Sequence, residues 1–346
     1  MRLMDAYRGT RQGLARSLQG SVGSRLVLEP VVVASYRRYL RTDRTPALGY
    51  SAMRKLFGSP RGWRLDELAD RSAREHGPID ISDAPGVISD PAGQVLETLR
   101  GDGIVVLDSR LPEDSCSALT ELAARAQCDL IEGDPGAPAQ AQFDAEWPKA
   151  VRYDIPEPQL LASEAVQRLL ADRSVLAIAQ AYLGGVPVQD LVAMWWTAAS
   201  TRSSSAAAQQ FHFDLDRLRF LKLFVYLTDV GPENGPHVYV RGSHRSLPEP
   251  LRDDRRFSDA EVLAHFDEDD IVSVTGQRGT IFLADTKGLH KGVNAAAGNR
   301  LVFQLEYATS FFGAAVPKAE IRRPSRELRS AMADFPSTYR RFDSHH

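Results

Sequence analysis

The chain has little cysteine, little lysine and no long apolar segment. Its two cysteines, Cys116 and Cys128, are too few for a disulfide framework, and we expect both to be reduced thiols. No run of residues approaches the roughly 18 consecutive apolar positions that a membrane-spanning helix needs. Arginines interrupt the N-terminus before an apolar signal segment can form. We therefore expect a cytoplasmic protein with no membrane span.

What is present is typical of a globular chain: 346 residues, 43% of them hydrophobic and 25% charged. Positive charge gathers near the N-terminus. Residues 1–60 carry ten arginines and Lys55 against three acidic residues, a net charge of +8, so the rest of the chain carries −11. We expect this basic segment to dock on the acidic remainder. The sequence has no alternation of aromatic and basic residues that would indicate a nucleic-acid partner.

The kind of predicted element changes along the chain. Residues 1–90 contain short amphipathic helical segments, with a break at Pro30, and show no chemical motif. Longer helices are predicted for 112–130 and 163–183. The predicted strands are 103–107, 191–197, 210–214, 220–228, 237–240, 271–274, 280–284 and 301–309. Helices followed by a run of short strands favour a mainly β fold, a double-sheet jelly roll with flanking helices.

One short motif carries metal-binding chemistry. His212 and Asp214 are two residues apart on a predicted strand, so both side chains point to the same face. His290 follows a later strand and would supply a third ligand through sheet pairing. Two histidines and one carboxylate on one face of an octahedron leave three positions open, which is the ligand set of non-haem Fe(II) oxygenases.

An arginine ten residues after His290 strengthens this interpretation. Arg300 opens a strand on which period two places Arg300, Val302 and Gln304 on one face. A barrel-facing arginine needs an anion, and its planar fork suits a carboxylate. The far carboxylate of 2-oxoglutarate would supply that anion, and Gln304 is a second candidate for contact with it.

The combined pattern resembles the phytanoyl-CoA dioxygenase family of Fe(II)/2-oxoglutarate-dependent oxygenases, over roughly residues 95–312. The matching segments are His212-Phe213-Asp214, Tyr226-Leu227-Thr228-Asp229-Val230, Asn234-Gly235-Pro236, Gly242-Ser243-His244-Arg245, Asp285-Thr286 before His290, and Arg300. The resemblance implies a double-stranded β-helix (cupin-like) core, His212, Asp214 and His290 as iron ligands, Arg300 as the 2-oxoglutarate residue, and dioxygen as the other co-substrate.

The resemblance also suggests a division of the chain. We expect a helical N-terminal appendage at residues 1–90, the double-stranded β-helix oxygenase domain with its supporting helices at 91–315, and a helical C-terminal tail at 316–346. A monomer or a homodimer is expected.

Two positions refine the expected chemistry. Some family members carry a hydroxyl residue two positions after the second histidine, where this chain has Gly292. Another group must then assist Arg300, and Lys222 is the candidate because it shares its parity with Phe224 and Tyr226. Related halogenases replace the ligand carboxylate with a small residue, so the presence of Asp214 favours oxygenation, desaturation or ring formation.

The residues that would meet the substrate are less sharply indicated. Trp195 and Trp196 are adjacent on a strand, so one faces the barrel and the other the helices. Arg152 lies in a polar segment that could reach the barrel mouth, and His237 follows Pro236 near the predicted centre. We name all four as candidate substrate-binding residues.

The expected activity is oxidation of a C–H bond in a small molecule, by hydroxylation or oxidative ring formation. The preferred substrate is a natural-product or sugar-containing biosynthetic intermediate. An acyl-CoA or acyl-carrier hydroxylase is the alternative, although the acidic catalytic part disfavours CoA. A non-catalytic jelly-roll binding protein also stays open, as does a cupin-like zinc or manganese enzyme, which would leave Arg300 without an anion.

Overall fold

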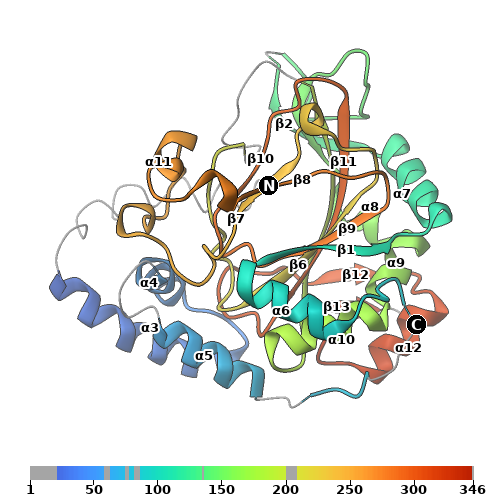
Figure 1. The fold of residues 1–346 in the computed structure, drawn as a ribbon. Coiled ribbons are helices and arrows are strands. Elements are labelled where there is room, and N and C mark those ends of the chain that lie inside the picture. The colour runs from blue at the N-terminus through green and yellow to red at the C-terminus, as the bar shows by residue number, and fades with distance from the viewer. Residues whose placement is uncertain are drawn as a thin grey trace.

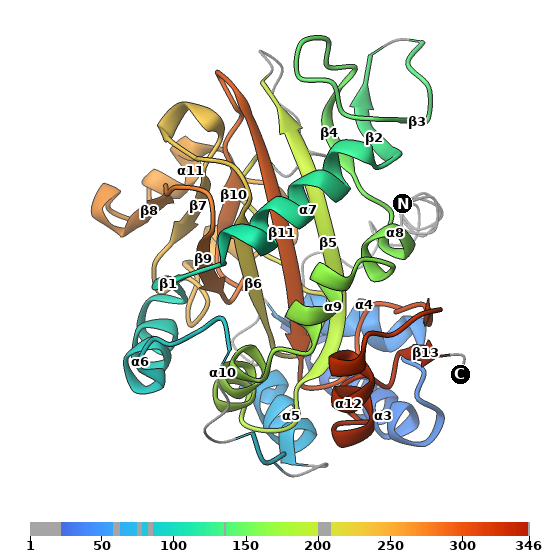
Figure 2. The same ribbon diagram turned by 90° about the vertical axis from the view of Figure 1, so that its right-hand side faces the viewer.

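Two antiparallel sheets face each other in the computed structural model, which describes residues 22–57, 63–74, 78–81, 86–134, 136–199 and 209–344. Figure 1 shows the smaller sheet opposite the long strands of the larger one, and Figure 2 shows helices crossing the outer face of the larger sheet. The prediction of a mainly β jelly roll with flanking helices is confirmed.

The larger sheet has eight strands in the order β1-β9-β6-β11-β5-β4-β2-β3. Its strands are β1 (Ile104–Arg110), β2 (Cys128–Gly133), β3 (Gln140–Ala141), β4 (Ala150–Asp154), β5 (Val188–Ala198), β6 (Phe220–Tyr226), β9 (Thr280–Ala284) and β11 (Asn299–Ala308). The smaller sheet has the order β10-β7-β8. Its strands are β7 (His237–Val240), β8 (Ile271–Val274) and β10 (His290–Gly292).

Period two decides what lies between the sheets. On β5, β6 and β11, every second side chain points toward the smaller sheet. The resulting interior is largely aromatic and aliphatic, with Trp195, Phe224, Tyr226, Tyr239, Phe282 and Val302 among its members. The alternate residues of the same strands join the outer core, which the flanking helices cover. This interior is the space into which the predicted site residues of β6, β7 and β11 point.

The helices over the outer face are α6 (Ala92–Asp102), α7 (Glu113–Arg125), α8 (Glu157–Leu161), α9 (Glu164–Leu170), α10 (Arg173–Leu183) and α12 (Arg326–Asp334). The predicted helix 163–183 is two helices, because Asp172 stops the first and caps the second by accepting a hydrogen bond from the Val175 amide. The predicted helix 112–130 ends at Arg125, and Cys128 begins β2 instead. Both cysteines are buried free thiols.

Two further segments differ from the sequence prediction. The expected strand 210–214 is reduced to single bridges at Phe211 and His212. The C-terminal segment, predicted to be helical, holds α12 between two short parallel strands, β12 (Ala319–Ile321) and β13 (Phe342–Ser344). Its apolar side chains belong to the main core, and burial there stabilises this short parallel pair.

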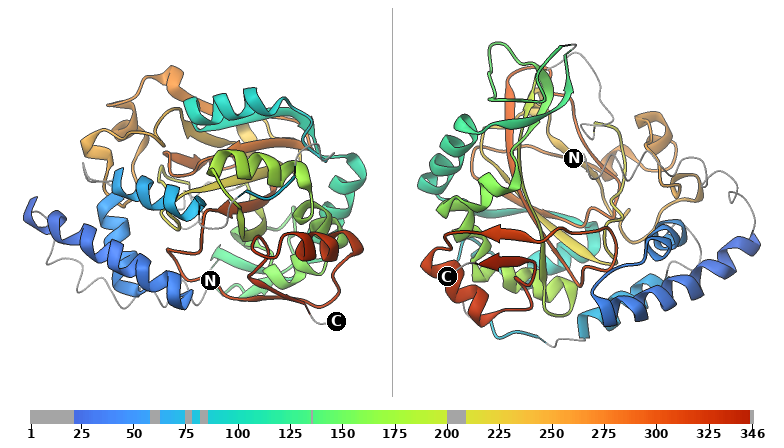
Figure 3. Two further views of the ribbon diagram at one scale, coloured as in Figure 1. Left: turned by 90° about the horizontal axis from the view of Figure 1, so that it is seen from below. Right: turned by 180° about the vertical axis from the view of Figure 1, so that it is seen from behind.

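The N-terminal helices are α3 (Val22–Thr42), α4 (Ala47–Phe57) and α5 (Trp63–Arg74), which form a cluster of their own beside the sheets (Figures 1 and 3). Helix α3 continues through Pro30, where the sequence predicts a break. Packing of Tyr36 and Tyr39 against Phe312 compensates for the hydrogen bond that proline removes.

Two observations bear on the other expectations for the N-terminal part. Arg54 pairs with Asp254, so one contact joins the basic segment to the acidic remainder, whereas residues 1–21 lie outside the described part. The remaining α-helix is α11 (Asp259–Leu263). None of the described helices combines the length and the apolar character that a helix needs to cross a bilayer. The boundaries at residues 90 and 315 stay predictions.

Candidate metal centre

Sheet pairing brings the two predicted histidine ligands face to face. His212 and His290 form an isolated antiparallel bridge in which each amide donates to the other's carbonyl oxygen, at 3.0 and 2.8 Å. Their ring centroids are 4.3 Å apart, and both residues are buried. A directly opposed pair of this kind sets the two imidazoles side by side.

The orientation of both imidazole rings is set by the backbone. The Nδ1 atom of His212 lies 2.9 Å from the Gln210 carbonyl oxygen, and that of His290 lies 3.0 Å from the Gly288 carbonyl oxygen. Because a carbonyl oxygen only accepts, each Nδ1 must carry the proton, which leaves both Nε2 atoms free to bind a metal ion.

Asp214 is the third candidate metal ligand, and its carboxylate lies close to both imidazoles. Its Oδ1 lies 3.9 Å from His212 Nε2, and its Oδ2 lies 3.5 Å from His290 Nε2. One ligand atom from each of the three residues lies within 4.8 Å of the other two. The Asp214 amide donates to the Thr286 carbonyl oxygen at 2.8 Å, which ties the carboxylate's backbone to the segment before His290. The three side chains could therefore hold one metal ion.

The electrostatics favour the protonation states that a metal requires. Burial lowers the pKa of His212 and of His290, so both imidazoles are neutral. Burial alone would raise the pKa of Asp214, but the Lys222 ammonium and the two histidines offset it, and the pKa is lowered. Two neutral imidazoles and a carboxylate are a ready ligand set, because no proton must leave before the metal binds.

Lys222 points into the barrel, as its parity predicts, but it contacts carboxylates of this chain. Its Nζ donates to Asp214 Oδ2 at 2.6 Å and lies 3.3 Å from Glu306 Oε2. These two charges raise the pKa of Lys222 against the opposing effect of burial. Lys222 is thus engaged with a candidate ligand, Asp214, and its contact with 2-oxoglutarate stays a prediction.

We expect Lys222→Met to weaken Fe(II) binding by about 10- to 100-fold, because the Asp214 carboxylate loses the contact that orients it. Equilibrium Fe(II) titration measures the effect. Lys291→Met is the matched control, since the Lys291 ammonium makes an equally short ion pair with Asp259, which is not a candidate ligand. Equal Fe(II) affinities of the Lys222 variant and the wild type would contradict this role.

Arg300 is buried, and no acidic neighbour acts on it among the described residues. Its exposed fraction is 6%, and its Nη2 donates a hydrogen bond to Thr197 Oγ1 at 3.3 Å. The Nε atom has no hydrogen-bond partner among the described residues. Burial lowers the pKa of this guanidinium, and no carboxylate offsets the cost of its charge. The arrangement fits an anionic ligand with a carboxylate at its end, as 2-oxoglutarate has.

The family comparison agrees with this site. The family model for phytanoyl-CoA dioxygenase (PhyH) matches residues 99–299, a range that includes all three candidate ligands. The chain belongs to the phytanoyl-CoA dioxygenase family. It is accordingly an Fe(II)/2-oxoglutarate-dependent dioxygenase, with iron as its metal and 2-oxoglutarate and dioxygen as co-substrates.

Several solved structures are similar to this phytanoyl-CoA dioxygenase family member. AviO1 from Streptomyces viridochromogenes is 22% identical, with a TM-score of 0.45 over 66% of this chain and 98% of that one. SnoK, a non-heme alpha ketoglutarate dependent carbocyclase from nogalamycin biosynthesis, is 16% identical, with a TM-score of 0.48 over 66% and 87%. EctD from S. alaskensis with bound Fe is 19% identical, with a TM-score of 0.45 over 67% and 83%. Among curated proteins, no match reaches significance.

The adjacent tryptophans of this dioxygenase lie on opposite faces of β5. Trp195 faces the interior, and the Arg152 guanidinium of β4 lies over its ring at 4.3 Å while pairing with Asp154. Trp196 stacks on Phe143 in the outer core, with ring centroids 4.4 Å apart. A substrate-binding role for Trp196 is therefore corrected, because the sheet separates its indole from the interior.

The remaining predicted residues face the interior. Gln304 is buried on β11, opposite Phe224 of β6 and Ala193 of β5. His237 is buried on β7, and its ring stacks on that of His290 at a centroid distance of 5.5 Å. Both lie on the same side of the larger sheet as Arg300.

Two interior residues of the site were not identified from the sequence. Thr197 accepts the hydrogen bond from Arg300, and Glu306 contacts Lys222. Period two would have found Glu306, since it shares its parity with Arg300 and Gln304, whereas Thr197 shares its parity with Trp195, whose orientation the sequence left open. Burial raises the pKa of Glu306 well above its usual value, and its carboxylate is not among the converging ligand atoms.

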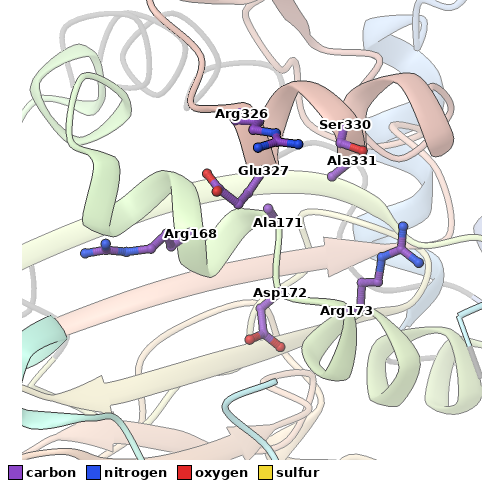
Figure 4. Close-up of a pocket in the computed structure, with 8 residues that line it drawn as sticks. All are labelled: Arg168, Ala171, Asp172, Arg173, Arg326, Glu327, Ser330 and Ala331. Carbon is purple, nitrogen blue, oxygen red and sulfur yellow. The ribbon is translucent and has the colours of Figure 1, made fainter. Parts of the chain in front are cut away.

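A surface pocket elsewhere does not belong to this centre. Figure 4 shows it between α12 and the turn that joins α9 to α10, on the outer side of the larger sheet. Three arginines line it, Arg168, Arg173 and Arg326, together with Asp172 and Glu327. Arg173 already pairs with Asp334. The pocket is separated from the interior by the main core, and we assign it no part in the chemistry.

Proposed function

We propose that this dioxygenase binds Fe(II) through His212, Asp214 and His290, holds 2-oxoglutarate through Arg300, and oxidises a C–H bond of a small molecule. One observation carries the proposal. Two neutral imidazoles and a carboxylate converge on one point, and the same interior holds a buried guanidinium that has no acidic neighbour. A purely structural arginine would be paired with a carboxylate at this depth, because an unpaired buried charge is costly.

The residues of the chain have distinct tasks in this scheme. Bound Fe(II) and 2-oxoglutarate together supply the oxidising power from dioxygen. The two imidazoles and Asp214 would hold the iron, and a set of three protein ligands would leave room for co-substrate and dioxygen. Lys222 orients Asp214, and Arg300 receives the far end of 2-oxoglutarate. The aromatic interior around Trp195 and Phe224 excludes water from the reacting atoms.

We further propose that the substrate is a natural-product or sugar-containing biosynthetic intermediate, which is hydroxylated or closed into a ring. Arg152 over the Trp195 ring offers a cation and an aromatic face at the interior edge of β4 and β5. Hydroxyl-rich rings pack on aromatic faces and bond to such donors. The net charge of −11 beyond residue 60 disfavours a CoA thioester.

The test is anaerobic. Fe(II) and then 2-oxoglutarate are added to metal-free protein, and the visible metal-to-ligand charge-transfer band is recorded. We expect a band that saturates with 2-oxoglutarate. Protein that is folded and binds iron but shows no band would overturn the proposal. Succinate release on addition of polyhydroxylated compounds, compared with acyl-CoA thioesters, then tests the substrate class; stimulation by thioesters alone would overturn the sugar or natural-product assignment.

A further inference from the structure

His237 lies where a second co-substrate residue would be needed. In the register of the smaller sheet, it is directly opposite Gly292, two residues after His290. Its ring packs beside the stacked Phe224 and Phe282 rings, at centroid distances of 5.2 and 5.3 Å, and stacks on His290. Because Gly292 has no side chain, the imidazole has no neighbour across the strand pair to cover its edge.

The Nε2 atom of His237 is buried and has no hydrogen-bond partner in the described part of the chain. The nearby Tyr226 hydroxyl is already engaged: it accepts from the His237 amide and donates to the Val274 carbonyl oxygen, both at 2.9 Å. A buried polar atom left alone costs about 1–3 kcal/mol. Such an unsatisfied group calls for an explanation, and at a site for a small ligand one explanation is a hydrogen bond that forms when the ligand binds.

Arg300 presents the same feature from the opposite sheet. It too has a buried nitrogen without a partner, and its charge acts directly on His237. The ring of His237 stacks on the candidate ligand His290, and burial, with the charges of His290 and Arg300 adding to it, lowers the pKa of His237. Two buried nitrogen atoms without partners in the described part of the chain thus face one interior from two sheets, whereas the Lys222 ammonium is already paired with Asp214.

We propose that His237 donates a hydrogen bond from its free ring nitrogen to the distal carboxylate of 2-oxoglutarate, across from Arg300. This assignment rests on the proposed function. A carboxylate offers enough lone pairs for a guanidinium and an imidazole together. His237 is thus a co-substrate residue, and its earlier placement among the substrate-binding candidates is replaced.

The experiment compares two keto acids on His237→Phe, a change that keeps the ring and removes both nitrogens among neighbours that are already aromatic. The anaerobic charge-transfer band is titrated with 2-oxoglutarate and with 2-oxovalerate, which lacks the distal carboxylate. We expect the Kd for 2-oxoglutarate to rise by about 10- to 100-fold, as for loss of a hydrogen bond to a charged group, with little change for 2-oxovalerate. The Fe(II) affinity should be unchanged.

His244→Phe is the matched control, because His244 also has a buried ring nitrogen without a partner but lies in the turn after β7, outside the ligand set. It should leave both titrations unchanged. His237→Gln, which keeps a donor, should recover part of the lost affinity. His237→Met also removes both ring nitrogens, so we expect the same rise in the Kd for 2-oxoglutarate. It replaces His237→Phe in the experiment if that variant does not fold.

The experiment distinguishes failure of the proposed function from failure of the His237 assignment. Wild-type protein without a charge-transfer band would overturn the proposed function. A normal wild-type band, combined with no loss in His237→Phe or an equal loss for both keto acids, would overturn the assignment of His237 and leave the proposed function standing.

Discussion

Replacing Asp214 with alanine should abolish turnover. The variant loses the one negative charge that faces both histidines, so we expect Fe(II) affinity to fall by more than about 100-fold and the charge-transfer band to disappear. Succinate formation should drop to background. Asp216→Asn is the matched control, because Asp216 lies two residues further along the same segment but is not among the converging ligand atoms. It should retain the band.

The same substitution should also lower stability, since it removes the closest counter-charge of buried Lys222. Breaking a buried pair costs about 3–5 kcal/mol, and contact with Glu306 offsets part of it. The double variant Asp214→Ala, Lys222→Met should therefore melt at a higher temperature than Asp214→Ala alone and still bind no iron. Iron binding by either variant at wild-type affinity would show that Asp214 is not a ligand.

Replacing Arg300 with methionine should raise the 2-oxoglutarate Kd by about 100- to 1,000-fold, because a bidentate, charge-assisted contact in a buried place is lost. Fe(II) binding should be unchanged, since Arg300 contacts none of the candidate ligands. Arg300→Lys keeps the charge but not the fork and should give an intermediate Kd. The anaerobic titration and the concentration dependence of succinate release both measure the effect.

Arg152→Met serves as the comparison for Arg300. The two arginines lie in one cross-strand row, on either side of Thr197, but Arg152 is only partly buried and already pairs with Asp154. Removing it should change the 2-oxoglutarate Kd by less than about threefold, in keeping with the small value of such pairs. An Arg300→Met variant that binds 2-oxoglutarate as the wild type does would refute the assignment of Arg300.

The N-terminal helices are closer to the centre than the sequence suggested. The Tyr50 hydroxyl of α4 donates to Asp216 Oδ1 at 3.4 Å, and the Phe57 ring lies 5.2 Å from that of Phe213, between the ligands His212 and Asp214 in the chain. Residues 1–90 were expected to form a helical appendage without a chemical motif. These contacts place α4 directly behind the ligand segment.

Most of the strands could be predicted because their side chains alternate or form apolar runs. The β7, β8 and β9 ranges match the expected residues, and β5, β6 and β11 differ from theirs only at the ends. The strands β2, β3 and β4 were missed. Their residues are mixed in polarity, so pairing at the sheet edge, of β4 with β5, of β2 with β4 and of β3 with β2, and not local pattern, makes them strands.

The sequence by itself determined the fold class, the ligand spacing His212-x-Asp214 and the face shared by Arg300 and Gln304. The reason is that the alternation of side chains along a strand depends only on the spacing of neighbouring residues in the chain. Only the tertiary structure decided which of Trp195 and Trp196 faces the interior, that Lys222 contacts Asp214, and that His237 lies opposite Gly292. These depend on pairing between strands far apart in the chain, where one residue of register turns a side chain to the other face of the sheet.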